Sequence, residues 1–437
     1  MNRLKKRMMN MLMYYFDDPY KELFESRIIC VHGDITSKEQ VTGFSEYKFS
    51  TIINCAACVK HFAADDVLER INVQGVENLI DFCKNNGRRL IQISTVSVAG
   101  EGSDGVPPMS RVFCENDLYI GQNITNEYIR TKFLAERAVL EAVSEGLDGK
   151  VVRVGNLMSR NSDGEFQINF ITNGFLRSLR GYAAVGKFPM GGMHEVAEFS
   201  PIDSTALAVL RLAQTDRRFT VFHACNSHHI YMADLIYAMR SYGFRIDIVR
   251  DEEFEAAVKE FAKTGQDSDA VSGLIAYTSH NENEIYTIDY SNRFTAQVLY
   301  RLDYKWPVTD DRYLENAIAA LDRLTFLIDS GGKITMEIIT KTEGNKATME
   351  ISGWLDTQTA PQLGEALSGL DDSITSLVFD FTNLEYISSA GLRQVIVAYK
   401  KWLKRMDLRS SMFLMRFTMY SALQGLTARL IFRRSNC

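Results

Sequence analysis

Proline, tryptophan and long apolar runs are scarce in this chain. Its 437 residues include 7 Pro and 3 Trp. The apolar runs fall well short of the about 18 residues that a membrane-spanning helix requires, so we expect no membrane segment or membrane partner. The formal net charge of −6 gives no reason to expect nucleic-acid binding. The length predicts more than one domain.

Metal-ligating residues are also sparse. The 7 cysteines lie mostly in apolar contexts, which predicts buried thiols and a cytoplasmic location. Cys55 and Cys58 have CxxC spacing, but they fall inside a predicted strand without a second pair, so we interpret them as structural. His223, His228 and His229 have no Cys or carboxylate at ligand spacing, and we expect no metal site.

Short apolar runs alternate with helical patterns over the first 155 residues. Continuous apolar runs of this kind are typical of parallel strands buried on both faces, so we predict an α/β fold with a doubly wound parallel sheet. Ligands of such sheets bind at the carboxyl ends of the strands. The predicted strands are 27–31, 50–56, 90–94 and 150–154, and the predicted helices are 2–24, 64–85 and 123–145.

A glycine-rich phosphate loop is missing from this pattern. A dinucleotide-binding fold opens with a strand, a Gly-rich turn and a helix, whereas the first glycine here is Gly33. Gly100-x-Gly102-x-x-Gly105 matches the motif, but Pro107 and Pro108 follow, so we interpret it as a surface loop. The sequence therefore predicts an incomplete Rossmann-like sheet that lacks the first strand, the phosphate loop and the second strand.

Tyr128 and Lys132 are the strongest catalytic candidates. Side chains four residues apart project from the same face of a helix, and an ammonium beside a phenol lowers the phenol pKa. Such a tyrosine can donate a proton to a carbonyl oxygen during reduction, and the Thr95 hydroxyl at a strand end can hold the same oxygen. The alternative is an ordinary amphipathic helix and a strand-end cap.

A set of short strings occurs in a fixed order along residues 1–330. They are Val31-His32-Gly33-Asp34, 54–62, Asn72-Val73-Gln74-Gly75-Val76, 94–98, Tyr128-x-x-x-Lys132, Arg153-Val154-Gly155-Asn156, Phe199-Ser200-Pro201-Ile202-Asp203 and Trp306-Pro307. Together these strings resemble the thioester reductase domains of nonribosomal peptide synthetases, a branch of the extended short-chain dehydrogenases/reductases. The resemblance implies NADPH as cofactor. It also implies a phosphopantetheinylated carrier protein or other acyl thioester as partner, with release of an aldehyde or alcohol.

The resemblance also implies roles for individual residues. Tyr128 would be the proton donor, Lys132 would hold the nicotinamide ribose, and Thr95 would hold the carbonyl oxygen. The residues implied to approach the cofactor are Asp34, Ala56, Ala57, Lys132 and Asn156. The alternative for Asp34 is a solvated aspartate in a turn. The alternative for Ala56, Ala57 and Asn156 is plain packing at the strand ends. The resemblance begins after the family's second strand, so we expect weak NADPH binding by this chain.

The remaining part of residues 1–330 is predicted to form a substrate lobe, followed by a linker at 329–333. The lobe pattern predicts helices at 165–183, 232–242 and 251–269 and strands at 218–224 and 246–249.

Residues 334–437 change character. Alternating patterns at 335–340 and 347–351, a helix at 359–368 and a buried strand at 377–380 precede the string from Tyr386 to Arg393. This segment resembles a STAS domain, the small α/β fold of anti-sigma factor antagonists. The resemblance implies a non-catalytic module with a kinase or anti-sigma-type partner and phosphorylation at Ser389; a simple helix cap is the alternative.

The predicted STAS core consists of Ile351, Leu355, Leu363, Leu367, Val378, Phe379, Ile387, Leu392, Val395 and Val397. The end of the chain departs from the STAS pattern, because residues 405–437 contain six arginines and no acid after Asp407. A shifted reading frame, an abnormal terminus and a functional basic tail remain open for this segment.

Three functions are compatible with the sequence. One is an NADPH-dependent thioester reductase with a fused regulatory module. Another is a catalytically dead reductase remnant that acts as a binding or regulatory protein. The third is an extended short-chain enzyme that acts on a nucleotide sugar or acyl-CoA.

Overall fold

The computed structural model describes residues 20–398 except 60–65, 168–169, 265–273, 275–284, 325, 328–335, 356–358, 372 and 388–390. It also describes residues 5, 8, 9, 12 and 429–431. The chain divides into two compact units. Unit 1 comprises Met1–Phe166, Ala197–Ile230 and Asn281–Thr309, and unit 2 comprises Gln167–Val196, Tyr231–His280 and Asp310–Cys437. The expected helix at 2–24 and the expected linker at 329–333 fall largely outside the described residues.

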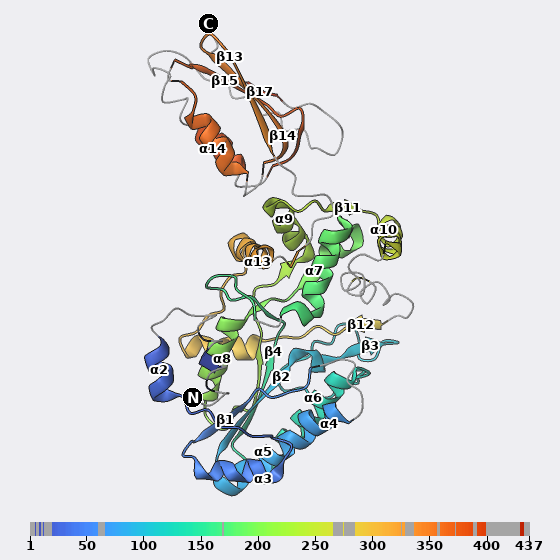
Figure 1. Cartoon of the computed structure of the whole chain (residues 1–437). Coiled ribbons are helices and arrows are strands. Elements are labelled where there is room, and N and C mark those ends of the chain that lie inside the picture. Colours follow the sequence, from blue (N-terminus) through green and yellow to red (C-terminus); the bar gives the residue numbers. More distant parts are fainter. Residues whose placement is uncertain are drawn as a thin grey trace. The chain divides into compact units, whose positions relative to one another are not determined.

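A parallel sheet forms the centre of unit 1 (Figure 1). Its strands lie in the order β1 (Thr51–Asn54), β2 (Arg89–Thr95), β4 (Gly149–Val154) and β9 (Val221–Ala224). β2 and β4 are largely apolar because both faces of the sheet are covered there, and Leu90 in β2 is completely buried, whereas Ile53 in the edge strand β1 is exposed. The predicted parallel α/β sheet is confirmed.

Helices pack on both faces of this sheet. α5 (Gly75–Asn86) and α6 (Glu127–Ser144) contribute to the hydrophobic cluster on one face, and α8 (Ile202–Ala213) and α12 (Arg293–Arg301) contribute to the cluster on the other. The shorter helical elements of the unit are α2 (Tyr20–Arg27), α3 (Lys38–Thr42), η1 (Gly43–Glu46), α4 (Val67–Glu69), the π-helical η2 (Arg70–Gln74) and η3 (Val96–Ala99).

The predicted strand at 27–31 is wrong. Arg27 ends α2, the residues after it form no strand, and Ile29 is 79% exposed. Among the described residues β1 is the edge of the sheet, and no strand lies beyond it to pair with this segment. A strand without a neighbour leaves its N–H and C=O groups unpaired, so an apolar pattern alone does not stabilise it.

Two helices begin later than the sequence predicted, and each begins at an asparagine cap. The Asn126 side chain accepts a hydrogen bond from the Ile129 N–H, so α6 starts at Glu127 rather than at 123. The Asn173 side chain caps α7 (Gly174–Val185) in the same way, where a start at 165 was expected.

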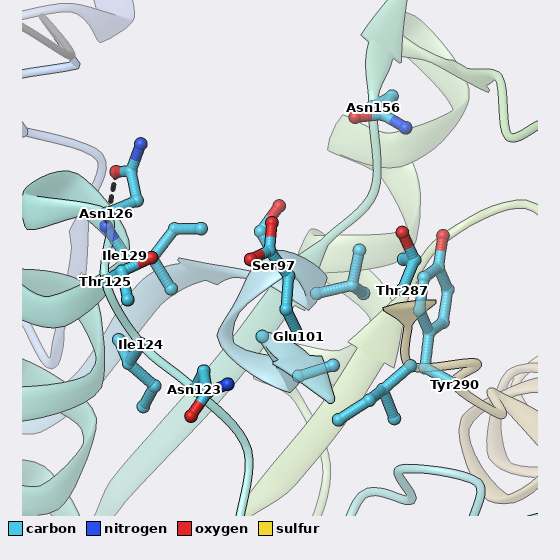
Figure 2. Close-up of a pocket in the computed structure, with 14 residues that line it drawn as sticks. Ser97, Glu101, Asn123, Ile124, Thr125, Asn126, Ile129, Asn156, Thr287 and Tyr290 are labelled. Carbon is cyan, nitrogen blue, oxygen red and sulfur yellow. Dashed lines mark hydrogen bonds between the residues drawn. The ribbon is translucent and has the colours of Figure 1, made fainter. Parts of the chain in front are cut away.

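The string Gly100-x-Gly102-x-x-Gly105 forms a β-hairpin element and does not open a helix. Its strand β3 (Glu101–Ser103) pairs antiparallel with β12 (Ile285–Thr287), and Glu101 stands opposite Thr287 in the register (Figure 2). Two further short strands, β5 (Leu157–Met158) and β8 (Ser200–Pro201), pair in parallel.

Unit 2 begins with a lobe of helices and short strands. The predicted helix at 232–242 is confirmed, and the strand expected at 246–249 is β11, which pairs in parallel with β6. The elements of the lobe are η4 (Phe170–Thr172), α7, β6 (Lys187–Pro189), η5 (Met190–His194), β7 (Val196–Ala197), β10 (Ile230–Tyr231), α9 (Met232–Tyr242), β11 (Asp247–Val249), α10 (Asp251–Lys263) and α13 (Asp311–Arg323); β7 and β10 lie at the unit boundary.

A second sheet contains the C-terminal strands and is separate from the parallel sheet. β14 (Lys346–Leu355) lies between β13 (Glu337–Glu343) and β15 (Ser376–Asp380), β17 (Arg429–Ile431) pairs antiparallel with β15, and β16 (Leu384–Ile387) pairs with β14. The helices of this region are α14 (Ala360–Ser368) and residues 391–398. Within the poorly patterned end, β17 is the segment that the structure describes.

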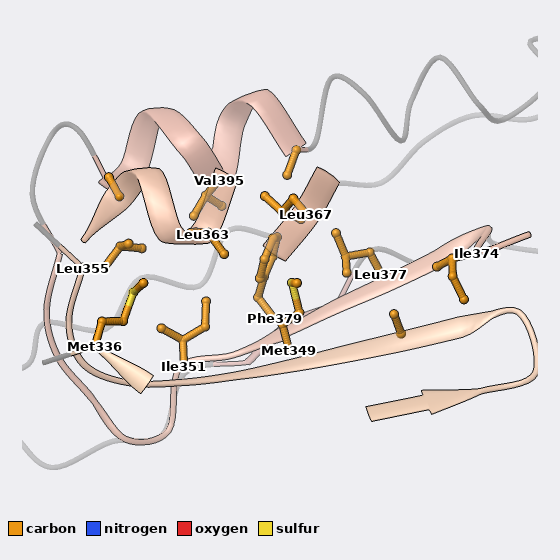
Figure 3. Packing of buried hydrophobic residues seen from close by; sticks show 13 residues of the cluster. Met336, Met349, Ile351, Leu355, Leu363, Leu367, Ile374, Leu377, Phe379 and Val395 are labelled. Carbon is orange, nitrogen blue, oxygen red and sulfur yellow. The ribbon is translucent and has the colours of Figure 1, made fainter. Parts of the chain in front are cut away.

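The core of this second sheet matches most of the prediction (Figure 3). The expected members Ile351, Leu355, Leu363, Leu367, Phe379 and Val395 belong to the buried cluster, and Ile387 packs against it. Val378 is buried, and Leu392 is partly buried. Val397 is 53% exposed, so its assignment to the core is wrong. Ser389 lies outside the described residues.

None of the helices in the described part of the chain combines the length and apolar character needed to cross a membrane.

Candidate active site

The carboxyl ends of β1, β2 and β4 meet at one edge of the parallel sheet. At the end of β1 the buried Asn54 donates a hydrogen bond to Gln92 (2.9 Å) and accepts one from the Ala56 N–H (3.1 Å). Asn72 in η2 binds both the N–H (2.8 Å) and the carbonyl oxygen (3.0 Å) of Cys58. These bonds fix the turn that carries Ala56, which is exposed, and Ala57, which is half-buried.

Lys132 reaches this edge from α6. Its Nζ donates a hydrogen bond to the Ile93 carbonyl oxygen in β2 (3.0 Å) and lies 6.0 Å from the centre of the Tyr128 ring. The side chain is almost completely buried, and the desolvation lowers the pKa of Lys132 to about 8 although the Glu136 carboxylate opposes the shift. The predicted proximity of Tyr128 and Lys132 is therefore present.

The predicted lowering of the Tyr128 pKa does not occur in this structure. Tyr128 is partly buried, and desolvation raises its pKa above the ordinary value. The Lys132 ammonium donates to the Ile93 carbonyl oxygen in β2. Burial disfavours the charged forms of both Lys132 and Tyr128. A phenol with a raised pKa is protonated at neutral pH, as a proton donor must be.

Thr95 lies at the end of β2 and caps the short helix η3. Its Oγ1 accepts a hydrogen bond from the Ser97 N–H (3.1 Å) and donates one to Ser97 Oγ (3.0 Å). Ser97 in turn lines the neighbouring cavity. The two hydroxyls thus form a chain from the strand end to the cavity.

Asn156 follows β4 and is held by a buried carboxylate. Its N–H donates a hydrogen bond to Glu198, which is only 6% exposed and also accepts bonds from the Ser200 hydroxyl and the Asn226 N–H. Burial raises the pKa of Glu198, and the three donors oppose that shift. A Cβ at Gly155 would overlap the Glu198 carboxylate, so glycine permits this approach.

Asp34 is exposed beside a turn and belongs to no described strand. Its carboxylate accepts a hydrogen bond from the Thr36 N–H (2.9 Å), which lowers the pKa of Asp34. The geometry alone is that of a solvated turn aspartate, one of the two alternatives for this residue.

A cavity of about 240 Å³ opens beside these strand ends (Figure 2). Ile129 and Asn126 of α6 and its cap lie on one side, Thr287 and Tyr290 lie on the other, and Glu101 lies between them. Asn156 and Ser97 also line the cavity. It is therefore adjacent to the predicted catalytic residues, although Thr95, Tyr128 and Lys132 are not part of its lining.

Two carboxylates of this region, Glu198 and Glu101, have no signal in the sequence pattern. Glu198 precedes the string Phe199–Asp203, but a single Glu gives no signal of the strand ends that it joins. Glu101 stands between two glycines of the string that we interpreted as a surface loop. Its backbone bonds to Asn123 and the pairing of β3 with β12 place it at the cavity.

A fully buried ion pair lies beneath the site. Arg153 in β4 donates to both carboxylate oxygens of Glu136 in α6, with the shortest distance at 2.8 Å, and both side chains are 0% exposed. Arg153 also donates to the Asp117 carbonyl oxygen (2.8 Å) and to His223 Nε2 (2.9 Å). Since His223 Nδ1 faces the Ser291 carbonyl oxygen (2.7 Å), Nδ1 carries the ring proton, and burial lowers the pKa of His223 to about 3.

Metal-ligating side chains do not gather anywhere in the described part of the chain. Cys55 and Cys58 follow β1 instead of lying within it, and Cys55 is exposed. Of the other described cysteines, Cys83 and Cys225 are buried and Cys30 and Cys114 are partly exposed, so the expectation of buried thiols is correct only in part.

A family model described as "Male sterility protein", an NAD-binding family, matches residues 2–209, and a STAS domain model matches residues 337–408. A linear gramicidin synthase of Brevibacillus parabrevis is 24% identical over 297 residues, which is 65% of this chain and 6% of that protein. An L-2-aminoadipate reductase of Candida glabrata is 22% identical over 283 residues, 59% of this chain and 20% of that protein. The chain thus spans only a small part of these curated relatives.

Two solved structures give higher identity than these curated relatives. A thiolation-reductase di-domain from an archaeal non-ribosomal peptide synthetase is 34% identical with a TM-score of 0.66, covering 74% of this chain and 68% of that one. The Aureusimine biosynthetic cluster reductase domain is 27% identical with a TM-score of 0.61, covering 73% and 80%. The chain therefore belongs to the thioester reductase family of non-ribosomal peptide synthetases, NAD(P)H-dependent oxidoreductases of the extended short-chain type, and carries a STAS domain in its C-terminal part.

Proposed function

We propose that this chain uses NADPH to reduce an acyl or peptidyl thioester, held on a phosphopantetheinylated carrier protein, to an aldehyde or alcohol. The observation that carries the proposal is the placement of Tyr128 and Lys132. Both lie on one face of α6, at the carboxyl edge of a parallel sheet and beside a cavity. The similarity to a thiolation-reductase di-domain supports a carrier-bound substrate.

The described residues fit the nicotinamide end of such a cofactor. The Lys132 ammonium has three N–H donors. Among the described residues, one of them bonds to the Ile93 carbonyl oxygen and the other two have no hydrogen-bond partner. The remaining donors can hold ribose hydroxyls. Ala56, Ala57 and Asn156 present backbone and short side chains at the same edge, and Asp34 would take the adenine side.

The proposed roles follow from the positions of the side chains. The bound cofactor would supply a hydride to the thioester carbonyl carbon. Tyr128 would donate its proton to the carbonyl oxygen, and the charged Lys132 would hold the ribose and favour proton loss from Tyr128. Thr95 would orient the carbonyl oxygen together with Ser97. Loss of the carrier thiol from the resulting hemithioacetal would release the aldehyde.

The test is reduction of an acyl group loaded on a carrier protein. The purified chain is mixed with the acylated carrier and either NADPH or NADH. Because we expect weak NADPH binding by this chain, the cofactor is supplied at high concentration. We then expect NADPH oxidation matched by release of free carrier thiol and by formation of aldehyde or alcohol. Thiol release without cofactor oxidation would mean hydrolysis and would contradict the proposal. Faster turnover with NADH would contradict the choice of NADPH. The requirement for a reduced cofactor and free thiols would suit the cytoplasm.

We further propose that the STAS domain binds a regulatory partner, a kinase or an anti-sigma-type protein, and that phosphorylation of Ser389 controls this binding. The support is the position of Ser389 in the sequence, two residues before the helix at 391–398 begins. The N-terminus of a helix stabilises a phosphate group. We expect mass spectrometry of the protein from its native cells to find phosphate on Ser389 and to lose it in Ser389→Ala. Phosphate confined to Ser388 would contradict this assignment, with Ser388→Ala as the control.

A further inference from the structure

Glu101 occupies a fixed position at the cavity. Its backbone N–H donates to the Asn123 carbonyl oxygen (3.1 Å), and its own carbonyl oxygen accepts from the Asn123 N–H (2.7 Å). On its other side it stands opposite Thr287 of β12. Neighbouring backbone segments lie on both sides of Glu101 and fix the position of its Cα atom. Its side chain therefore lies between the two walls of the cavity (Figure 2).

The two flanking glycines make this placement possible. Gly100 has φ +66°, and a Cβ there would lie 2.5 Å from the Asn123 carbonyl oxygen. A Cβ at Gly102 would overlap the Tyr286 ring. Larger residues would push β3 away from both neighbours. The glycines that resembled a phosphate loop therefore serve the close packing that holds Glu101.

The charge of Glu101 has no counter-ion among the described residues. It takes part in none of the ion pairs that the described side chains form. The other residues that line the cavity carry no charge at neutral pH. A ligand that fills the cavity removes water from the carboxylate, and this costs free energy unless the ligand supplies a positive charge.

The cavity also limits the size of its ligand. Its volume of about 240 Å³ is below the range of roughly 300–1,000 Å³ that is typical of ligand pockets. A short acyl group is enough to fill this space, whereas most of a long fatty acyl chain would remain outside it.

We propose that Glu101 is a specificity-determining residue that selects a short acyl group carrying an ammonium, such as an aminoacyl group, at this cavity. This inference rests on the proposed thioester reduction, because it names the class of acyl group that the site accepts. The ammonium binds the Glu101 carboxylate, and the thioester carbonyl lies toward Ser97 and Asn156, on the side of the strand ends.

The experiment compares two pantetheine thioesters of the same shape, β-alanyl and butanoyl, which differ by an ammonium in place of a methyl group. A charge-assisted hydrogen bond corresponds to about tenfold to a hundredfold in affinity, so we expect kcat/KM to favour β-alanyl by that factor. In Glu101→Gln this preference collapses toward unity, mainly through a higher KM for the β-alanyl thioester. Asp104→Asn is the matched control, because it removes a carboxylate from the same hairpin at an exposed residue with φ +52°.

A binding measurement separates this inference from the proposed reaction. The β-alanyl and butanoyl amides of the same pantetheine arm, with NH in place of the thioester sulfur, cannot release a thiol, and calorimetry reports their affinities. Tighter binding of the β-alanyl amide that disappears in Glu101→Gln supports the cavity assignment even if no thioester is reduced. Equal affinities of the two amides, or turnover of both thioesters with equal kcat/KM, would overturn it.

Discussion

Replacing Tyr128 with Phe is expected to lower the rate of thioester reduction by about 10²–10⁴-fold, the usual effect of removing a positioned acid. The substitution deletes only the phenol hydroxyl, so the ring beside Lys132 remains. Thioester binding should change little, because the hydroxyl acts on the carbonyl oxygen as negative charge develops there. We therefore expect a slower reduction step in single-turnover experiments, with little change in the affinity for the thioester.

The control for this variant is Tyr300→Phe. Tyr300 lies on α12 and is 64% exposed, so removing its hydroxyl should leave the rate as it is. Normal turnover by Tyr128→Phe on an acylated carrier would show that the catalytic assignment is wrong. A matching loss in Tyr300→Phe would show that the assay reports stability rather than chemistry.

The same assignment predicts the pH dependence of the reaction. The pKa of Lys132 is about 8, and its charged form is the one proposed to act. The rate should therefore fall as pH rises through about 8, while Tyr128 stays protonated because burial raises its pKa. A rate that keeps rising above pH 8 would contradict a role for the charged lysine.

Breaking the buried ion pair is expected to destabilise unit 1 by about 3–5 kcal/mol. Arg153→Met leaves the Glu136 carboxylate without its partner in a position with no solvent exposure. It also removes donors from the Asp117 carbonyl oxygen and from His223. Urea unfolding followed by circular dichroism should show a lower midpoint.

A double variant tests whether the loss comes from the unpaired charge. Replacing a buried pair with apolar side chains is often close to neutral, so Glu136→Leu combined with Arg153→Met should recover much of the stability. The exposed pair of Glu127 and Arg130 on the same helix is the control, and Glu127→Gln should cost less than about 1 kcal/mol. Equal losses from Glu127→Gln and Arg153→Met would contradict the expected effect of burial.

The sequence alone determined the features that depend on local pattern. The strands at Leu90 and Val152 follow from short, mainly apolar runs, because a parallel strand buried on both faces does not need the alternation of polar and apolar residues. The shared helix face of Tyr128 and Lys132 follows from the helical period. The separate second sheet follows from alternating residues at 335–351, where one face is half-buried.

Tertiary structure decided the features that depend on neighbours distant in the chain. Residues 27–31 have a strand pattern but form no strand, because pairing requires a partner that sequence periodicity does not supply. The pKa of Tyr128 is raised instead of lowered, since burial depends on what packs over α6. Glu101 reaches the cavity because its backbone bonds to Asn123 and because β3 pairs with β12, about 180 residues later in the chain; no local pattern encodes these contacts.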